Sequence, residues 1–323
     1  MLRRAAFDVG SGATKMQVSD VNSSLRRIVG PVLFGQERPV PFGAAWLASA
    51  DGRIPPEMIT KGIETLRDLK AIAIELGASS FSAVATEVFR KAENGEEFLT
   101  QVRSDLDIPI EIVTQQLEAE LGFATALAFD ESADDNLVSW DSGGASFQIT
   151  ICKGGAMQMY LGALGTSRTL KTLVNGVRGL ALDDATIKAV NPVTVAECDQ
   201  LLVALHAELP DVPEWLSNIE AITAIGGPNS MFSVASSVLG GASEMSSETI
   251  HDALLKCLGK TDSELQYLID FEFADPVSLI VPKLCLFHVV ALHLARKRLR
   301  TVRFQPCIGS CAGLLVTEGL WRT

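Results

Sequence analysis

Aromatic residues, paired cysteines and long apolar runs are all scarce in this sequence. Aromatic side chains make up only 6% of the chain, which argues against a stacking surface for single-stranded nucleic acid. The six cysteines form no C-x-x-C pair, so we expect neither a zinc site nor a disulfide framework but idle thiols in a reducing cytosol. The longest apolar stretch, 279–295, is interrupted by Pro282, Lys283 and two histidines, which is typical of a buried helix rather than a membrane span.

Basic residues are also fewer than acidic ones, 27 against 39. The formal net charge is -12 and the sequence pI is about 4.9, so the chain as a whole repels nucleic-acid backbones. The densest basic run, at 296–300, is interpreted as the charged end of a helix. The first residues lead directly into a strand-like run and contain no secretory signal. We therefore expect a cytoplasmic protein with no nucleic-acid or membrane partner.

The pattern of apolar residues predicts two similar α/β lobes. With 323 residues, of which 47% are hydrophobic, the chain is long for a single core, and two domains are expected. A strand predicted over Ala5–Val9 ends in a glycine-rich turn, and a half-buried strand over Thr14–Val21 follows. The same plan recurs from Asn136–Trp140 to Ser146–Cys152. Helices follow both hairpins, the first half ending in one predicted over Gln115–Phe129.

The first glycine-rich turn, within Asp8–Lys15, has the composition of a phosphate loop. Its G-x-G matches part of a dinucleotide fingerprint, but a strand follows it and the third glycine is missing. A hairpin whose backbone N–H groups face a phosphate fits better, with Gly10, Ser11 and Gly12 as the binding residues. Asp8, at the end of the strand, is placed to hold Mg2+ or its water. For this motif alone, a plain hairpin turn with a capping aspartate is the alternative.

A second loop of the same kind opens the second half of the chain. Asp141 ends a predicted apolar strand and is the second predicted metal ligand. The predicted phosphate-binding residues of this loop are Gly143, Gly144, Ala145 and Ser146. The strand expected over Ala221–Ile225 ends in a further glycine pair, Gly226-Gly227. Because two Asp-x-Gly loops can hold one phosphate chain from both sides, the pair favours phosphate binding over two plain turns.

Two further blocks carry a more specific signal. Residues 85–99 read ATEVFRKAENGEEFL, which is similar to a stretch A-T-x-x-x-R-x-A-x-N-x-x-x-F-L, and residues 111–121 read EIVTQQLEAEL, similar to E-I-I-S-G-x-E-E-A-R-L. Together with the segments 5–11, 141–146 and 224–228, these blocks resemble, in order, the exopolyphosphatase/guanosine-pentaphosphatase (Ppx/GppA) family of the actin/sugar-kinase/Hsp70 superfamily. The resemblance extends over nearly the whole chain, and it implies that Gly226-Gly227, at the family's third glycine site, bind phosphate.

The resemblance implies a phosphatase that acts on phosphoanhydrides with Mg2+ as cofactor. Glu118 takes the place of the family's catalytic glutamate, which directs the attacking water, and Arg90 that of an arginine that contacts phosphate. The implied fold is α/β, with two ribonuclease-H-like (actin-like ATPase) lobes and an interdomain cleft. We expect one lobe from residues 1–121 plus 306–323 and the other from 122–305.

The implied substrate is polyphosphate or guanosine pentaphosphate (pppGpp), and a homodimer is expected because family members often form dimers. The acidic composition favours short chains or the nucleotide over long polyphosphate, which needs an extended cationic track.

Several positions depart from the family pattern. Gln148 stands where the second loop of the family continues to a glutamate that helps bind the metal or polarise water. Leu117 and Glu120 replace a glutamate and an arginine beside the catalytic position, and the segment 313–317 lacks the arginine and glutamate of G-L-R-E-G. These differences point to a shifted substrate, weaker metal binding or a non-catalytic relative.

Two other functions fit the same loops. An ATP-dependent small-molecule kinase of the same superfamily would use Asp141 as a base toward a hydroxyl group, although the blocks around Arg90 and Glu118 favour the phosphatase. A nucleotide or phosphate sensor without turnover is suggested by Gln148.

Overall fold

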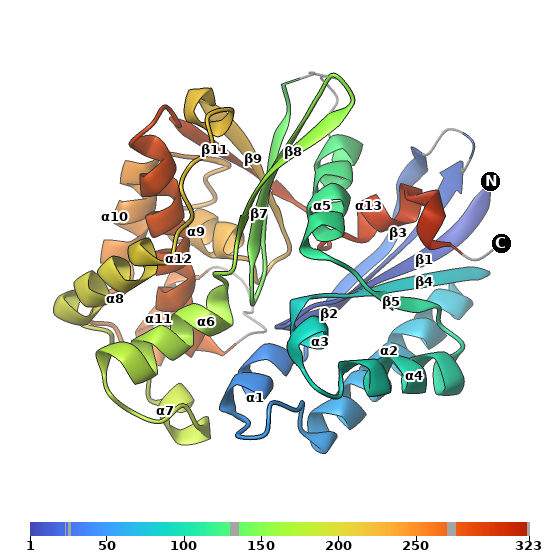
Figure 1. Cartoon of the computed structure of the whole chain (residues 1–323), viewed down its shortest axis with the longest axis horizontal. Coiled ribbons are helices and arrows are strands. Elements are labelled where there is room, and N and C mark those ends of the chain that lie inside the picture. Colours follow the sequence, from blue (N-terminus) through green and yellow to red (C-terminus); the bar gives the residue numbers. More distant parts are fainter. Residues whose placement is uncertain (23, 25–26, 130–135, 270–275, 322–323) are drawn as a thin grey trace. The chain divides into compact units, whose positions relative to one another are not determined.

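The protein consists of two compact units (Figure 1). The computed structural model describes residues 1–22, 24, 27–129, 136–269 and 276–321. The first unit comprises Met1–Asn136, Thr150–Met159 and Cys307–Thr323, and the second comprises Leu137–Ile149 and Tyr160–Pro306.

A five-stranded sheet in the order β3-β2-β1-β4-β5 forms the centre of the first unit. Its strands are β1 (Leu2–Val9), β2 (Ala13–Asn22), β3 (Arg27–Pro39), β4 (Ser80–Ala85) and β5 (Ile110–Ile112). The first three strands are antiparallel neighbours, whereas β4 and β5 run parallel to β1. Val9 pairs with Ala85, which pairs with Ile112, so the carboxyl ends of the three parallel strands lie level at one edge.

Helices cover this sheet and complete the first core. They are α1 (Phe42–Ala48), α2 (Pro56–Glu75), α3 (Glu87–Lys91), α4 (Gly95–Leu106), α5 (Gln115–Phe129) and α13 (Cys311–Val316), with a final 3-10 turn at Glu318–Leu320. Three fully buried rings, Phe42, Phe89 and Phe98, pack together with centroids 4.9–5.5 Å apart. This cluster joins α1, α3 and α4, and it fixes the short helix α3 against the unit.

A sheet in the order β10-β11-β9-β6-β7-β8 forms the centre of the second unit, although residues 150–159 of the β7–β8 hairpin belong to the first. Its strands are β6 (Val138–Ser142), β7 (Phe147–Lys153), β8 (Ala156–Gly162), β9 (Ala221–Gly226), β10 (Glu244–Met245) and β11 (Thr301–Pro306). Strands β6, β9 and β11 are parallel. Short loops join β6 to β7 and β7 to β8, so these adjacent strands are antiparallel hairpins. Three hairpin strands beside parallel strands repeat the plan of the first sheet.

Helices of the second unit surround a strongly apolar core. They are α6 (Thr166–Lys171), a π-helical turn (Thr172–Val177), α7 (Asp184–Lys188), α8 (Val195–Ala207), α9 (Met231–Val238), α10 (Ser247–Cys257), α11 (Asp262–Leu268) and α12 (Ile280–Ala295), with 3-10 turns at Leu216–Asn218 and Val277–Leu279. Trp140, Phe232 and Phe287 make edge-to-face contacts at 5.1–5.4 Å in this core. The segment Val277–Ala295 is long and apolar enough to cross a membrane, but 78% of it is buried inside the structure, as in the core helix of a folded domain.

Most of the elements expected from the sequence are present. The helix predicted over Gln115–Phe129 has these bounds, and both predicted hairpins form. The expected lobe boundary at residue 121 differs, because α5 packs on α13 of the first unit and this unit continues to Asn136. All six cysteines are free. In the basic run, Arg296 contacts His206 and Arg298 pairs with Glu220.

Two histidines that are far apart in the sequence meet in the second core. The rings of His251 on α10 and His288 on α12 lie 4.8 Å apart, and His288 is only 6% exposed. Burial, with a smaller effect of His251, lowers the pKa of His288 from 6.5 to about 4. The folded protein therefore resists protonation at this position, whereas the unfolded chain accepts a proton below pH 6.5.

We predict that stability falls as the pH drops through this window. The neutral His288 favours the folded state fully above pH 6.5, and this contribution is lost between pH 6.5 and 4, by up to about 3 kcal/mol. This contribution can be measured by urea unfolding of the wild type and of His288→Leu between pH 7.5 and 4. The wild type should lose more stability than the variant across this range, and parallel pH profiles would contradict the assignment.

Candidate functional site

The first predicted phosphate loop is a tight turn at the carboxyl end of β1. The amide of Gly10 donates to the carbonyl of Ala13 at 2.9 Å and closes the turn. The amide of Gly43 donates to the carbonyl of Ser11 at 2.7 Å and holds the loop from outside. The sequence interpretation assigned three amides of this loop to phosphate, but the turn uses that of Gly10. The amides of Ser11 and Gly12 have no acceptor among the residues that the structure describes, and these two can donate to an anion.

The carboxylate of Asp8 lies beneath this loop, and the Asp8 side chain is 7% exposed. Its Oδ2 accepts a hydrogen bond from the backbone amide of Ser310 at 3.1 Å and pairs with Nζ of Lys15 at 3.5 Å. The buried thiol of Cys311 follows Ser310, and burial, followed by the charge of Asp8, raises its pKa well above the ordinary value. This thiol therefore stays neutral and adds no second negative charge beside Asp8.

The two predicted catalytic residues contact each other directly. Arg90 on α3 and Glu118 on α5 form an ion pair with Nη1 and Oε2 2.6 Å apart. The same Nη1 donates to the carbonyl of Val113, just beyond β5. The side chains of Arg90 and Glu118 are 22% and 13% exposed, so both charges are largely withdrawn from water yet reachable from it. Thr114 caps the start of α5, since its hydroxyl accepts from the amide of Leu117 at 3.1 Å.

All the predicted residues of the first unit gather at one edge of its sheet. Asp8 and the first loop lie at the end of β1. Arg90 lies on the helix that follows β4, and Glu118 lies in the first turn of the helix that follows β5. In open α/β sheets, ligands bind outside the carboxyl ends of the parallel strands. The edge combines backbone donors, a fixed cation and a carboxylate, which are the groups needed to bind a phosphate and direct a water molecule.

The second loop repeats the turn geometry of the first. The amide of Gly143 donates to the carbonyl of Ser146 at 2.9 Å, so here too the first glycine closes the turn. The amide of Ser167 donates to the carbonyl of Gly144 at 2.7 Å and fixes the loop to the start of α6. Gly165 permits this approach, because a Cβ atom on it would lie 2.3 Å from the amide nitrogen of Ala145. Within this loop, Gly144 and Ala145 remain the candidate amide donors.

Gln148 makes the second loop chemically different from a loop with two carboxylates. Its side chain is 3% exposed, and its Nε2 donates to the hydroxyl oxygen of Ser146 at 2.9 Å. A glutamate at this position could not donate this hydrogen bond when ionised. Asp141, half-buried near the end of β6, is thus the carboxylate of this loop.

The third glycine site joins β9 to α9. A Cβ atom on Gly226 would lie 2.5 Å from the side chain of Ser230, which caps α9 by accepting from the amide of Ser233. The ammonium of Lys283 on α12 donates to the carbonyl of Asn229 in the same loop, although Lys283 is 97% buried. A buried cation therefore supports the loop that contains Gly227.

Three residues that position the loops were not identified from the sequence: Lys15, Gly165 and Lys283. Hairpin register could have revealed Lys15, because a turn over 10–13 places it opposite Asp8, where opposite charges pair. Gly165 and Lys283 carry no local signal, since both act through segments that are distant in the chain.

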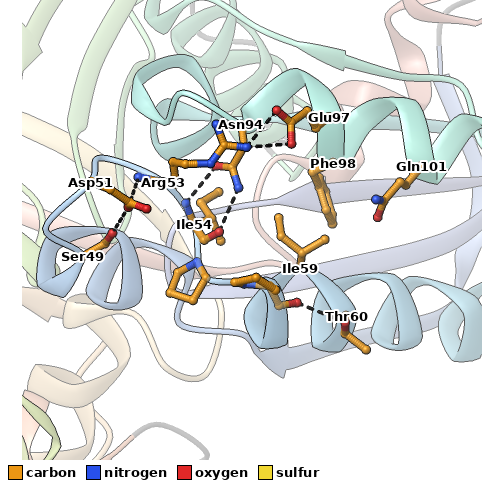
Figure 2. A pocket seen from close by; sticks show the side chains of 12 residues that line it. Ser49, Asp51, Arg53, Ile54, Ile59, Thr60, Asn94, Glu97, Phe98 and Gln101 are labelled. Atoms are coloured by element: carbon orange, nitrogen blue, oxygen red, sulfur yellow. Dashed lines mark hydrogen bonds and ion pairs between the residues drawn. The ribbon is translucent and has the colours of Figure 1, made fainter.

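A pocket of about 470 Å³ lies elsewhere in the first unit and contains none of the predicted site residues (Figure 2). It lies between the start of α2 and helix α4, and the ion pair of Arg53 with Glu97 spans its rim. The side chain of Asn94 holds its wall through two hydrogen bonds with the backbone of Ile54.

The sequence and the fold match the Ppx/GppA phosphatase family. The model of the Ppx/GppA phosphatase family matches residues 27–200. Exopolyphosphatase 1 of Mycobacterium tuberculosis is 25% identical over 154 residues, which cover 46% of this chain and 42% of the relative. Exopolyphosphatase 2 of the same species is 27% identical over 173 residues, covering 52% and 54%. The matched segment is thus about half the length of these curated relatives.

Two solved structures share the fold over almost their full length. The Aquifex aeolicus PPX-GPPA enzyme superposes with a TM-score of 0.70 at 19% identity, covering 98% of this chain and 99% of its own. An exopolyphosphatase-like protein superposes with a TM-score of 0.77 at 16% identity, covering 98% and 97%. The fold of this chain is therefore that of Ppx/GppA structures, as expected from the sequence.

We predict measurable coupling between Arg90 and Glu118. Arg90→Met leaves a carboxylate that is 87% buried without its cation, and a double-mutant cycle with Glu118→Gln should give a coupling energy of about 1–2 kcal/mol in urea unfolding. The exposed pair Arg53–Glu97 of the same unit is the control, with side chains 39% and 64% exposed, and its coupling should be much weaker because water screens its charges. Equal coupling in the two pairs would contradict the assignment.

Proposed function

The chain belongs to the Ppx/GppA phosphatase family, and from this premise we propose that it hydrolyses a phosphoanhydride and releases the terminal phosphate. The observation that carries the proposal is the Arg90–Glu118 ion pair at the edge of the sheet where the first phosphate loop also ends. Hydrolysis of a charged anhydride requires groups that neutralise the phosphate and a group that directs a water molecule. The side chains and amides at this edge can serve both purposes.

Backbone amides bind the phosphate in this mechanism. In the first unit the donors are Ser11 and Gly12, and in the second they are Gly144 and Ala145. Such donors are fixed by their turns before the substrate arrives, so they stabilise charge in the transition state without reorganising. In the second unit, Ser146 and the pair Gly226-Gly227 are further proposed contacts with phosphate.

Glu118 directs the attacking water. Its carboxylate accepts a hydrogen bond from the water, orients it toward the terminal phosphorus and takes up its proton as the bond forms. The contact with Arg90 restricts the rotamers of Glu118 and places a cation beside its carboxylate, whose side chain is only 13% exposed. Arg90 is also placed to stabilise the charge that develops on the phosphate oxygens.

We propose Mg2+ as the cofactor, with Asp8 as the candidate ligand of the first unit and Asp141 as that of the second. Among the described residues, no group of three or more His, Cys, Asp or Glu side chains is arranged to hold a metal. Mg2+ usually binds through one or two carboxylates together with substrate phosphates, so single carboxylates beside phosphate loops suit it. When bound, it would neutralise charge on the phosphate chain.

The substrate proposed is a short polyphosphate or guanosine pentaphosphate. Polyphosphate is suggested by the names of the mycobacterial relatives. The net charge of -12 favours short chains, because a long polyanion needs an extended cationic surface.

One observation favours a second function, phosphate or nucleotide sensing without turnover. Gln148 cannot act as a base or a charged metal ligand, and its amide is engaged by Ser146. A site with one carboxylate fewer would still bind phosphates through its backbone amides.

The test is phosphate release from pyrophosphate, short and long polyphosphate and guanosine pentaphosphate in the presence of Mg2+. We expect release from short polyphosphate or the pentaphosphate, and a loss of about a hundredfold or more in Arg90→Met, because the variant lacks the fixed positive charge. Lys91→Met is the matched control, since Lys91 is the next residue on α3 and pairs with Glu87.

Three outcomes would contradict the proposal. Tight binding of a phosphorylated ligand without cleavage of any anhydride would support the sensor. ADP formation from ATP that depends on an added sugar or acid would support the kinase. Equal losses of phosphate release in Arg90→Met and Lys91→Met would show that Arg90 has no special role in the reaction.

A further inference from the structure

The pair of Asp8 and Lys15 is set inside the first loop rather than on the surface. The two residues are direct partners across the β1–β2 ladder, and their side chains are 7% and 20% exposed. A Cβ atom built on Gly10 would lie 4.0 Å from both Oδ1 of Asp8 and Nζ of Lys15. The pair therefore borders the turn whose amides are proposed to bind phosphate.

A second glycine closes over the pair from the C-terminal segment. Gly309 has φ +52°, and a Cβ atom on it would lie 2.5 Å from Oδ2 of Asp8 and 2.5 Å from Cδ of Lys15. The next residue, Ser310, donates its amide to the same Oδ2. A side chain at this positive φ would be strained and would push against Asp8 and Lys15, so glycine lets the backbone approach the pair closely.

The two oxygens of Asp8 have different surroundings. Oδ2 takes both the ammonium of Lys15 and the amide of Ser310, whereas Oδ1 has no donor among the described residues. A divalent ion or its water can therefore reach Asp8 at Oδ1, but it would do so next to the positive charge of Lys15. Like charges this close repel, and Mg2+ gives up its water shell reluctantly.

We propose that Lys15 is a positioning residue that supplies the cation at Asp8 and weakens the binding of free divalent metal there. Asp8 is neutralised without a metal, and the metal binds well only when a phosphate chain adds its own negative charge. The inference rests on the proposed function for the identity of the anion, but the effect of Lys15 on metal affinity does not depend on turnover.

The experiment measures Mn2+ binding to the whole chain by electron paramagnetic resonance, without substrate. Lys15→Met should bind Mn2+ at least about tenfold more tightly than the wild type, because the repelling charge is gone. Lys15→Arg retains the charge and should stay near the wild type. In the double variant Asp8→Asn/Lys15→Met the gain should vanish, which assigns it to the Asp8 carboxylate. An unchanged affinity in Lys15→Met, or a gain that survives Asp8→Asn, overturns the proposal.

A second measurement on the wild type keeps the test independent of variant folding. Mn2+ should bind weakly alone and at least about tenfold more tightly with pyrophosphate, which adds negative charge beside Asp8. Tight Mn2+ binding without any anion, unchanged by pyrophosphate, overturns the proposal. If the wild type cleaves no anhydride while Lys15→Met still gains affinity, the proposed function fails and the role of Lys15 stands.

Discussion

The ion pair between Arg90 and Glu118 is the contact on which the first unit's site depends. It joins a helix that follows β4 to a helix that follows β5, and Arg90 also donates to the carbonyl of Val113 between these elements. Charges that are this far withdrawn from water need a partner, so each residue fixes the position of the other. The Phe42–Phe89–Phe98 cluster also helps to fix the position of Arg90, since Phe89 anchors the short helix that carries it.

The two units contain glycine turns of the same geometry, but different segments of the chain hold these turns in place. In both, the first glycine closes the turn and leaves the next amides for an anion. The first loop is held by the segment around Gly43, whereas the second is held by the start of α6. Cations also differ, with Lys15 beside Asp8 and the buried Lys283 behind the third glycine site. The repeated topology thus provides the two turns proposed to bind phosphate, and individual side chains determine the charge around them.

Local patterns predicted much of the fold but only part of the site. The hairpins and the helix Gln115–Phe129 followed from turn residues and periodicity, which are local properties. Arg90 and Glu118 were identified because the sequence around them resembles that of a family. Their direct contact could be seen only in the structure, because it links two helices that are distant in the sequence. The engagement of Gly10 in its own turn and the close approach of Gly309 depend on backbone geometry that no residue type specifies alone.

The central claim is that Glu118 directs the attacking water, and single-turnover hydrolysis of a short polyphosphate by Glu118→Gln tests it most directly. The substitution preserves the shape of the side chain but removes its capacity to accept a proton. The account predicts a loss of about a hundredfold or more in the rate of phosphate release, with substrate affinity retained. Glu120→Gln, two residues further along α5, should react like the wild type. Release by Glu118→Gln at the wild-type rate would contradict the account.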